Sequence, residues 1–272
     1  MAAEASPRLR PSEVFAAGGR RIGLWAFEGG AGPTVLLFPG FSWPGGMWEG
    51  VASRLPVDWT ILAPDLPGSG ATAWLAADED GPAAFLGDLV GVCGDRLREP
   101  LLCGYSMGGR VAWHLARRLG PACKGVLGVS CAPGRSAAEG QPGRETWLEA
   151  WASRFGAEDR VTVLADWDAQ PLLAGRERAT VGLMAARVRG EALGRLLVCW
   201  ADHRGTRVTE APACPTRLLI GGDDETIMAR TAGLADRVVA PDCGHAVPWR
   251  QPALVSGILG DMMQGAAPWT RP

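Results

Sequence analysis

The chain has 272 residues, of which 47% are hydrophobic and 21% charged, and its formal net charge at pH 7 is −2. This composition excludes a disordered chain and argues against a dedicated nucleic-acid-binding protein. The length suffices for one large α/β domain with an inserted subdomain and a full core. Lys124 is the only lysine, so a site for anions in this protein must be built from arginine.

Seven cysteines are scattered along the sequence, and none forms a Cys-x-x-Cys pair. This pattern is typical of a reducing compartment and predicts neither a disulfide framework nor a zinc site. The segment Met1–Arg21 lacks the apolar core of a signal peptide, and no stretch approaches the roughly 20 apolar residues of a membrane span. We therefore expect a cytoplasmic protein with no membrane or nucleic-acid partner, no metal and no cofactor.

Strand and helix patterns alternate along the first half of the chain. Residues 21–28 alternate enough to predict an edge strand, and a glycine-rich turn follows them. Continuous apolar runs such as 34–38 are expected of strands that are buried on both faces of a parallel sheet. In chain order, further strands are expected at 60–64, 100–103 and 125–130, with helices at 47–55, 82–98 and 111–118.

The pattern changes between about 133 and 208, where tryptophans punctuate arginine- and alanine-rich helical stretches without a buried strand. This interval predicts a helical cap over the carboxyl ends of the strands, while 1–132 and 209–272 form the core domain. Strands alternating with helices predict an α/β fold with a mostly parallel, doubly wound sheet. The sheet is expected to resume at 216–220 and 237–240, before a closing helix near 254–263.

The segment Gly104–Arg110 reads Gly-Tyr-Ser-Met-Gly-Gly-Arg between an apolar strand and a helix. Strand, Gly-x-Ser-x-Gly and helix is the context of a nucleophile elbow, in which the serine sits on a strained turn. Gly104 and Gly108 remove side chains that would collide there, and Gly109 lets the helix approach the strand. We therefore predict that Ser106 is a catalytic serine.

A catalytic serine needs a histidine base and an acid that orients it, in the chain order Ser, Asp, His for this topology. His245 follows the last strand in a loop, whereas His114 lies on the helix after the elbow and His203 in a polar stretch. The acid should end the penultimate strand. Asp224 fits the usual Gly-x-x-Asp spacing from Gly221, with Asp223 as the alternative.

Chemistry at such a serine also needs backbone N–H donors that stabilise a developing oxyanion. The amide of Met107 directly follows the serine and is expected to supply one donor. Phe41 is expected to supply the other from the segment Pro39-Gly40-Phe41, because Gly40 allows the chain to turn that amide inward.

Together these residues resemble the α/β-hydrolase fold over essentially the whole chain. Within that superfamily the chain is similar to the 2-succinyl-6-hydroxy-2,4-cyclohexadiene-1-carboxylate (SHCHC) synthases of menaquinone biosynthesis. One departure is Pro39, which stands where that family has histidine. The resemblance rests on the elbow with its arginine Arg110, on Pro39-Gly40-Phe41, on the cap motif Ala165–Pro171, and on the acid and histidine loops Gly221–Glu225 and Gly244-His245.

The resemblance implies a carbon–oxygen lyase that eliminates pyruvate from a cyclohexene carrying several carboxylates. In the reaction that the resemblance implies, the serine acts as a base on a carbon-bound proton and need not form an acyl-enzyme. Arginine binds carboxylates bidentately, and the positions that match the family's carboxylate-binding arginines are Arg110, Arg144 and Arg187, with Arg189 close by. Tyr105 and Trp167 are expected to line the pocket.

Two other interpretations remain open. A serine carboxylesterase or carbon–carbon hydrolase acting on a small ester, thioester or diketone needs the same triad but no arginine cluster. A non-catalytic binding protein of the same fold would have lost a triad member, and here all three candidates are present. The expected partner is a small anionic substrate, and the chain is expected to be a monomer or a homo-oligomer.

Overall fold

The computed structural model describes residues 7–16, 19–72, 81–132, 143–173, 186–200, 211–234 and 236–265. These residues form an eight-stranded sheet with the strand order β1-β2-β4-β3-β5-β6-β7-β8. β2 pairs antiparallel with β1 and β4, and the remaining neighbours are parallel. The bounds are β1 Arg10–Phe15, β2 Arg21–Phe27, β3 Thr34–Phe38, β4 Thr60–Pro64, β5 Leu101–Tyr105, β6 Gly125–Val129, β7 Thr216–Gly221 and β8 Arg237–Ala240.

The predicted parallel strands are confirmed, but the predicted edge strand is wrong. The segment that begins at Arg21 is β2, the second strand from the edge, because β1 pairs with it along its outer side. Most residues of β1 are exposed, including Phe15 at 65%. An exposed strand has no buried face that would impose an apolar alternation, so the sequence pattern carried no sign of it.

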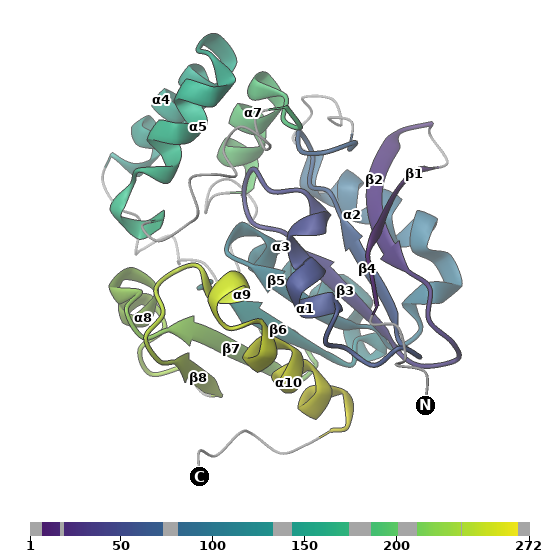
Figure 1. The fold of residues 1–272 in the computed structure, drawn as a ribbon. Helices are drawn as coiled ribbons and strands as arrows, with labels where there is room; N and C mark the ends of the chain where they lie inside the picture. The colour runs from purple at the N-terminus through teal and green to yellow at the C-terminus, as the bar shows by residue number, and fades with distance from the viewer. Residues whose placement is uncertain are drawn as a thin grey trace.

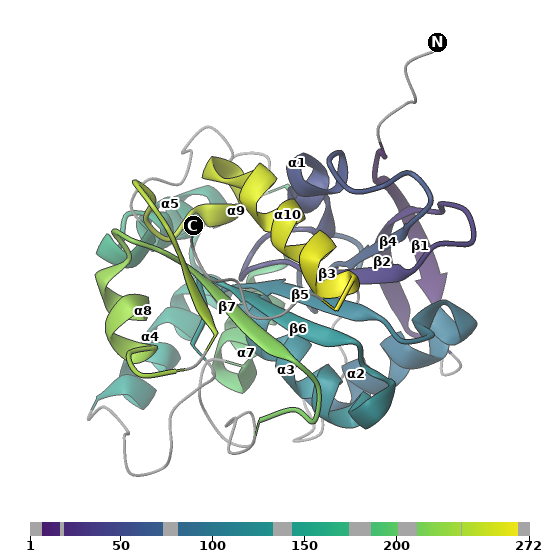
Figure 2. The same cartoon turned by 90° about the horizontal axis from the view of Figure 1, so that it is seen from below.

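The core consists of two apolar layers on opposite faces of the sheet, since successive side chains of a strand point to opposite sides. Leu36 and Phe38 of β3 belong to one cluster, which includes residues of α2 (Gly81–Cys93) and α3 (Met107–Leu119). Val35 and Leu37 belong to the other, with α1 (Glu49–Ala52) and α10 (Pro252–Met263). Figure 2 shows α1, α9 (Val247–Arg250) and α10 on one face and α2 and α3 on the other.

The described residues between β6 and β7 are helical. They form α4 (Arg144–Ala157), α5 (Arg160–Asp168) and α7 (Gly190–Trp200), which lie together above the sheet in Figure 1. Within 143–173 and 186–200 no strand occurs apart from one isolated bridge between Val188 and Ser69. The helical character of the cap is therefore confirmed for these residues. Its bounds at 133 and 208 stay a prediction, because both lie outside the described residues.

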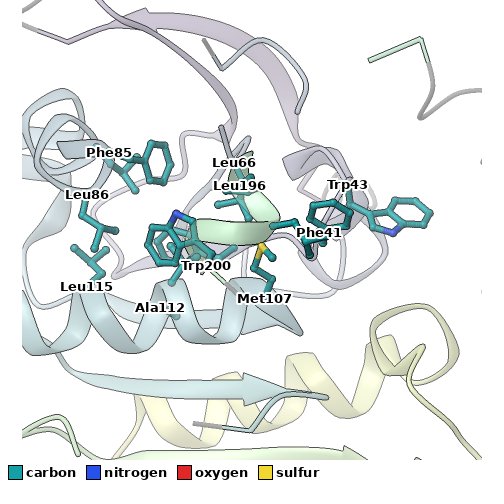
Figure 3. Close-up of a cluster of buried hydrophobic side chains, with 14 of the residues drawn as sticks. Phe41, Trp43, Leu66, Phe85, Leu86, Met107, Ala112, Leu115, Leu196 and Trp200 are labelled. Atoms are coloured by element: carbon teal, nitrogen blue, oxygen red, sulfur yellow. The ribbon is translucent and has the colours of Figure 1, made fainter. Parts of the chain in front are cut away.

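The cap helices pack closely on each other and on the core. A Cβ atom on Gly194 of α7 would lie 2.6 Å from the carbonyl oxygen of Ala152 in α4, so glycine permits this crossing. α7 in turn contributes to the cluster over α2 and α3, as Figure 3 shows for Leu196 and Trp200. None of the helices in the described part of the chain combines the length and the apolar character that a membrane crossing requires.

Trp200 is expected to be a main anchor of the cap. Its side chain is 1% exposed, and its ring lies 5.9 Å from that of His114 on α3. Replacing it with alanine should lower the free energy of unfolding by about 3–5 kcal/mol, measured by urea denaturation. The control Val161→Ala, at a 50% exposed position of α5, should change it by less than about 0.5 kcal/mol. Equal effects of the two substitutions would contradict this description of the packing.

Candidate active site

Ser106 sits on the turn between β5 and α3 with φ 51° and ψ −116°, a backbone conformation that non-glycine residues rarely adopt. Two hydrogen bonds hold the turn. The Ser106 amide donates to the carbonyl oxygen of Val129 at 2.9 Å, and the Gly109 amide donates to the Ser106 carbonyl oxygen at 3.1 Å. The strain is thus maintained by the neighbouring strand β6 and the first turn of α3.

The glycines around Ser106 make this turn possible. A Cβ atom on Gly104 would lie 2.1 Å from the Gly108 carbonyl oxygen, and one on Gly108 would lie 2.4 Å from that of Phe38. A Cβ atom on Gly109 would lie 2.3 Å from the sulfur of Cys131, the second residue after β6. These distances are too short for any side chain, which confirms the steric role predicted for the three glycines.

The serine is joined to a histidine and an acid by hydrogen bonds. His245 Nε2 lies 3.1 Å from Ser106 Oγ, and His245 Nδ1 lies 2.6 Å from Asp224 Oδ2. Asp224 and His245 are 4% and 2% exposed. With the Nδ1 proton directed at the carboxylate, Nε2 is free to accept the serine proton. The predicted relay of three hydrogen-bonded side chains is therefore present, and its catalytic role stays a prediction.

The acid occupies a fixed position at the end of β7. Asp224 is the N-cap of α8 (Glu225–Arg230), and its second oxygen, Oδ1, accepts from the Ile227 amide at 3.1 Å. A Cβ atom on Gly221 would lie 2.1 Å from the Gly244 carbonyl oxygen, so the acid and histidine loops are in direct contact.

The alternative residues lie elsewhere. Asp223 is exposed, and its amide donates to the Cys243 carbonyl oxygen of the histidine loop at 3.0 Å. His114 lies on α3, where its ring contacts Trp200. His203 lies outside the described residues.

Both residues predicted for the oxyanion site line the same cavity as Ser106. Met107 is the first residue of α3, and the first amides of a helix have no acceptor within the helix. Phe41 follows Gly40, where a Cβ atom would lie 2.6 Å from the Tyr105 ring, so only glycine allows this approach. Phe41 and Met107 belong to one apolar cluster (Figure 3). The role of their amides as oxyanion donors stays a prediction.

A cavity of about 250 Å³ opens onto Ser106 and His245. Aromatic rings form much of its wall: Trp167 is buried, with its ring 4.9 Å from Phe41 and 5.7 Å from Trp147. The Tyr105 ring lies 5.3 Å from the His245 ring. The other described lining residues are Met107, Arg110, Ser130, Cys131, Ala132, Gln170, Leu172, Leu173, Leu197, Ile227 and Arg230.

The charge of the cavity lining is positive. Arg110 lies on α3, and its Nη1 donates to the carbonyl oxygen of Trp200 at 3.2 Å. Arg230 at the end of α8 supplies a second guanidinium. No aspartate or glutamate occurs among the described residues of the lining. In the described part of the chain no group of three or more His, Cys, Asp or Glu side chains is placed to hold a metal ion.

Two predicted arginines are not brought to this cavity. Arg187 instead lines a second cavity of about 460 Å³, where its guanidinium stacks over Trp25 at 5.7 Å. Its carbonyl oxygen accepts from the Gly70 amide at 2.7 Å, and this bond ties the segment to the loop after β4. Arg189 is exposed, with its amide bound to the Gly68 carbonyl oxygen. Arg144 begins α4, and its side chain lies outside the described part of the chain.

Sequence reasoning missed Arg230, Ser130 and Gln170. The sequence offered one indication for Arg230. It lies on the helix that follows Asp224, one turn after the apolar residue Ile227. Gln170 belongs to the cap motif, and its amide nitrogen donates to the Trp167 carbonyl oxygen at 2.9 Å. Ser130 directly follows the apolar strand β6, and nothing in the sequence pattern indicated a role in the site.

A model of the alpha/beta hydrolase family matches residues 35–258. The chain belongs to this family. The SHCHC synthase of Klebsiella pneumoniae is 30% identical to it over 241 residues, which cover 85% of this chain and 94% of that enzyme. The SHCHC synthase of Serratia proteamaculans is 34% identical over 227 residues, covering 78% and 86%. These relatives confirm the resemblance and show that the protein is an enzyme, a lyase or a hydrolase of this fold.

The solved structure of MenH from S. aureus matches with a TM-score of 0.73 and 16% identity, over 89% of this chain and 98% of that one. At this identity the match shows the fold alone. It agrees with the family assignment.

The acid assignment can be tested without knowing the substrate. A fluorophosphonate labels a serine that is activated by a histidine base, so the labelling rate of Ser106 measures the relay. Asp224→Asn should slow labelling on the order of 10³–10⁴-fold, because the orientation of His245 is lost. Asp223→Asn is the matched control and should label at the parent rate, and Ser106→Ala should not label. Faster labelling of Asp224→Asn than of Asp223→Asn would contradict the assignment.

Proposed function

We propose that this protein is a carbon–oxygen lyase that eliminates pyruvate from a polycarboxylate cyclohexene and forms SHCHC. The single observation that carries the proposal is the cavity itself. It joins a Ser–His–Asp relay to two arginines, with no acid among the described lining residues. The SHCHC synthases among the relatives support this choice and a role in menaquinone biosynthesis.

In the proposed reaction His245 takes the hydroxyl proton of Ser106, and Asp224 stabilises the resulting imidazolium. The serine oxygen removes a carbon-bound proton of the substrate. The electron pair of that bond forms the new ring double bond, and the carbon–oxygen bond to the leaving group breaks. Pyruvate leaves as its enolate and takes the proton from His245, which restores the enzyme.

The oxyanion donors and the walls of the cavity would assist this step. Amides of Phe41 and Met107 are proposed to stabilise the enolate-like charge. The aromatic wall, with Trp167 and Tyr105, would exclude water, and a drier site strengthens each charge interaction. We propose no cofactor for this chemistry.

The charge of the cavity favours a polyanionic substrate over a neutral one. Arg110 is half-buried and tied to α7 through the Trp200 carbonyl oxygen, so its position is set before a ligand binds. A guanidinium held in this way binds a carboxylate through two parallel hydrogen bonds. An esterase for small neutral esters would gain nothing from this charge.

We propose further that the enzyme works in the cytoplasm on a small anionic substrate, as a monomer or a homo-oligomer, without nucleic-acid or membrane partners. None of the seven cysteines, all of which lie in the described part of the chain, forms a disulfide, which agrees with a reducing compartment.

Arg110→Ala separates lyase from esterase. We expect pyruvate release from the polycarboxylate, followed by a coupled lactate dehydrogenase assay, to fall by about 100- to 1,000-fold in kcat/KM, because a charge pair with the substrate is lost. Hydrolysis of p-nitrophenyl acetate, where it occurs, should change little. Arg118→Met, on the exposed side of the same helix, is the matched control and should match the parent in both assays.

An esterase would give the opposite balance. It would turn over the neutral ester rapidly with an acyl-enzyme burst, release no pyruvate from the polycarboxylate, and be insensitive to Arg110→Ala. That result would replace the proposal with the hydrolase alternative.

A further inference from the structure

Arg230 lines the cavity from α8, which follows β7, and not from the cap. It lies one turn after Ile227 on α8, and residues three apart share a face of a helix. Ile227 is buried in a small cluster with Cys131, and both line the cavity. The helix is anchored at its start by the Asp224 cap and by this contact. Arg230 is therefore held on the face of α8 that borders the cavity.

Ser130 directly follows β6 and lines the same cavity as this arginine. Its backbone has φ 47°, and its amide donates to the Leu219 carbonyl oxygen at 2.8 Å. The side chain is fully buried and lines the cavity, yet its hydroxyl has no hydrogen-bond partner among the residues that the structure describes. A buried hydroxyl without a hydrogen-bond partner costs free energy. A ligand atom that accepts a hydrogen bond from the Ser130 hydroxyl would remove this cost.

Cys131 lies next to Ser130 and does not neutralise the arginines. Its sulfur fills space left by two glycines, since a Cβ atom on Gly109 or Gly128 would lie within 2.6 Å of it. Burial raises the pKa of this thiol to about 12, although the charges of Arg110 and Arg230 act against the shift. The residue is therefore a neutral thiol at physiological pH, with one guanidinium approaching from α3 and another from α8.

We propose that Arg230 and Ser130 form a carboxylate-binding subsite that, together with Arg110, selects substrates with two anionic groups. Arg230 supplies the charge and Ser130 the hydroxyl donor. The subsite would have the carboxylate-binding role that the family resemblance implied for Arg187, which lines the second cavity. This inference rests on the proposed function, because it names the groups that would recognise the polycarboxylate.

The subsite predicts a specific split of kinetic parameters. Arg230→Met should raise the KM for the polycarboxylate by about 10- to 100-fold, since a hydrogen bond to a charged group is lost, while kcat changes little. Arg230→Lys should recover part of the affinity, and Ser130→Ala should raise KM several-fold. The control Arg195→Met, an exposed ion-pair position on α7, should leave both parameters unchanged. A fall in kcat alone, or the same KM in Arg230→Met as in the parent, would overturn the inference.

A second measurement tests the subsite independently of turnover. Succinate and acetate are used as probes that protect Ser106 from fluorophosphonate labelling. The parent should bind succinate more tightly than acetate, and Arg230→Met should lose this preference with a loss of about 10-fold or more in succinate affinity. Equal succinate protection in the parent and in Arg230→Met would overturn the subsite. A parent that releases no pyruvate but keeps the succinate preference would refute the proposed function and leave the subsite standing.

Discussion

The strained turn at Ser106 is the constraint on which the site depends. A residue with a side chain is held at φ 51° because three glycines leave room and because β6 and α3 bind its amide and carbonyl groups. This turn places the hydroxyl at the carboxyl ends of the parallel strands, where the loops after β3, β7 and β8 also lie. The stability of the surrounding parallel strands supports the turn, and local strain of this kind is typical of functional sites.

The electrostatics of the site follow from burial. Asp224 and His245 are almost fully buried, and the carboxylate is satisfied by both the imidazole and the Ile227 amide. Such a pair loses little solvation when a ligand enters, because it is already desolvated and oriented. The cavity then adds the positive charges of Arg110 and Arg230 beside this pair, and charges in a partly buried site act more strongly than in water. The arrangement is therefore suited to anionic ligands and to a transition state with developing negative charge.

The sequence predicted most of the fold and the relay, because both depend on local patterns. Apolar runs identified the buried strands, and the elbow needs its glycines at fixed spacings. The acid and the histidine were found because each follows a strand, and parallel strands bring their carboxyl ends to one edge. β1 was missed since its residues are exposed. Arg110 could be assigned from sequence because it belongs to the elbow motif. The positions of Arg187 and Arg230 could not, because they depend on how distant segments pack: the bridge at Val188 directs Arg187 toward Trp25, whereas packing of Ile227 against Cys131 brings Arg230 to the cavity.

The central claim is that Ser106 removes a carbon-bound proton and forms no covalent intermediate. The most direct test compares pyruvate release from the polycarboxylate with that from the same compound deuterated at the carbon that loses its proton, under single-turnover conditions, with intact-protein mass measured at each time point. The account predicts slower release from the deuterated compound and an enzyme mass that stays at the parent value throughout. Equal rates together with a transient mass increase on Ser106 would contradict it.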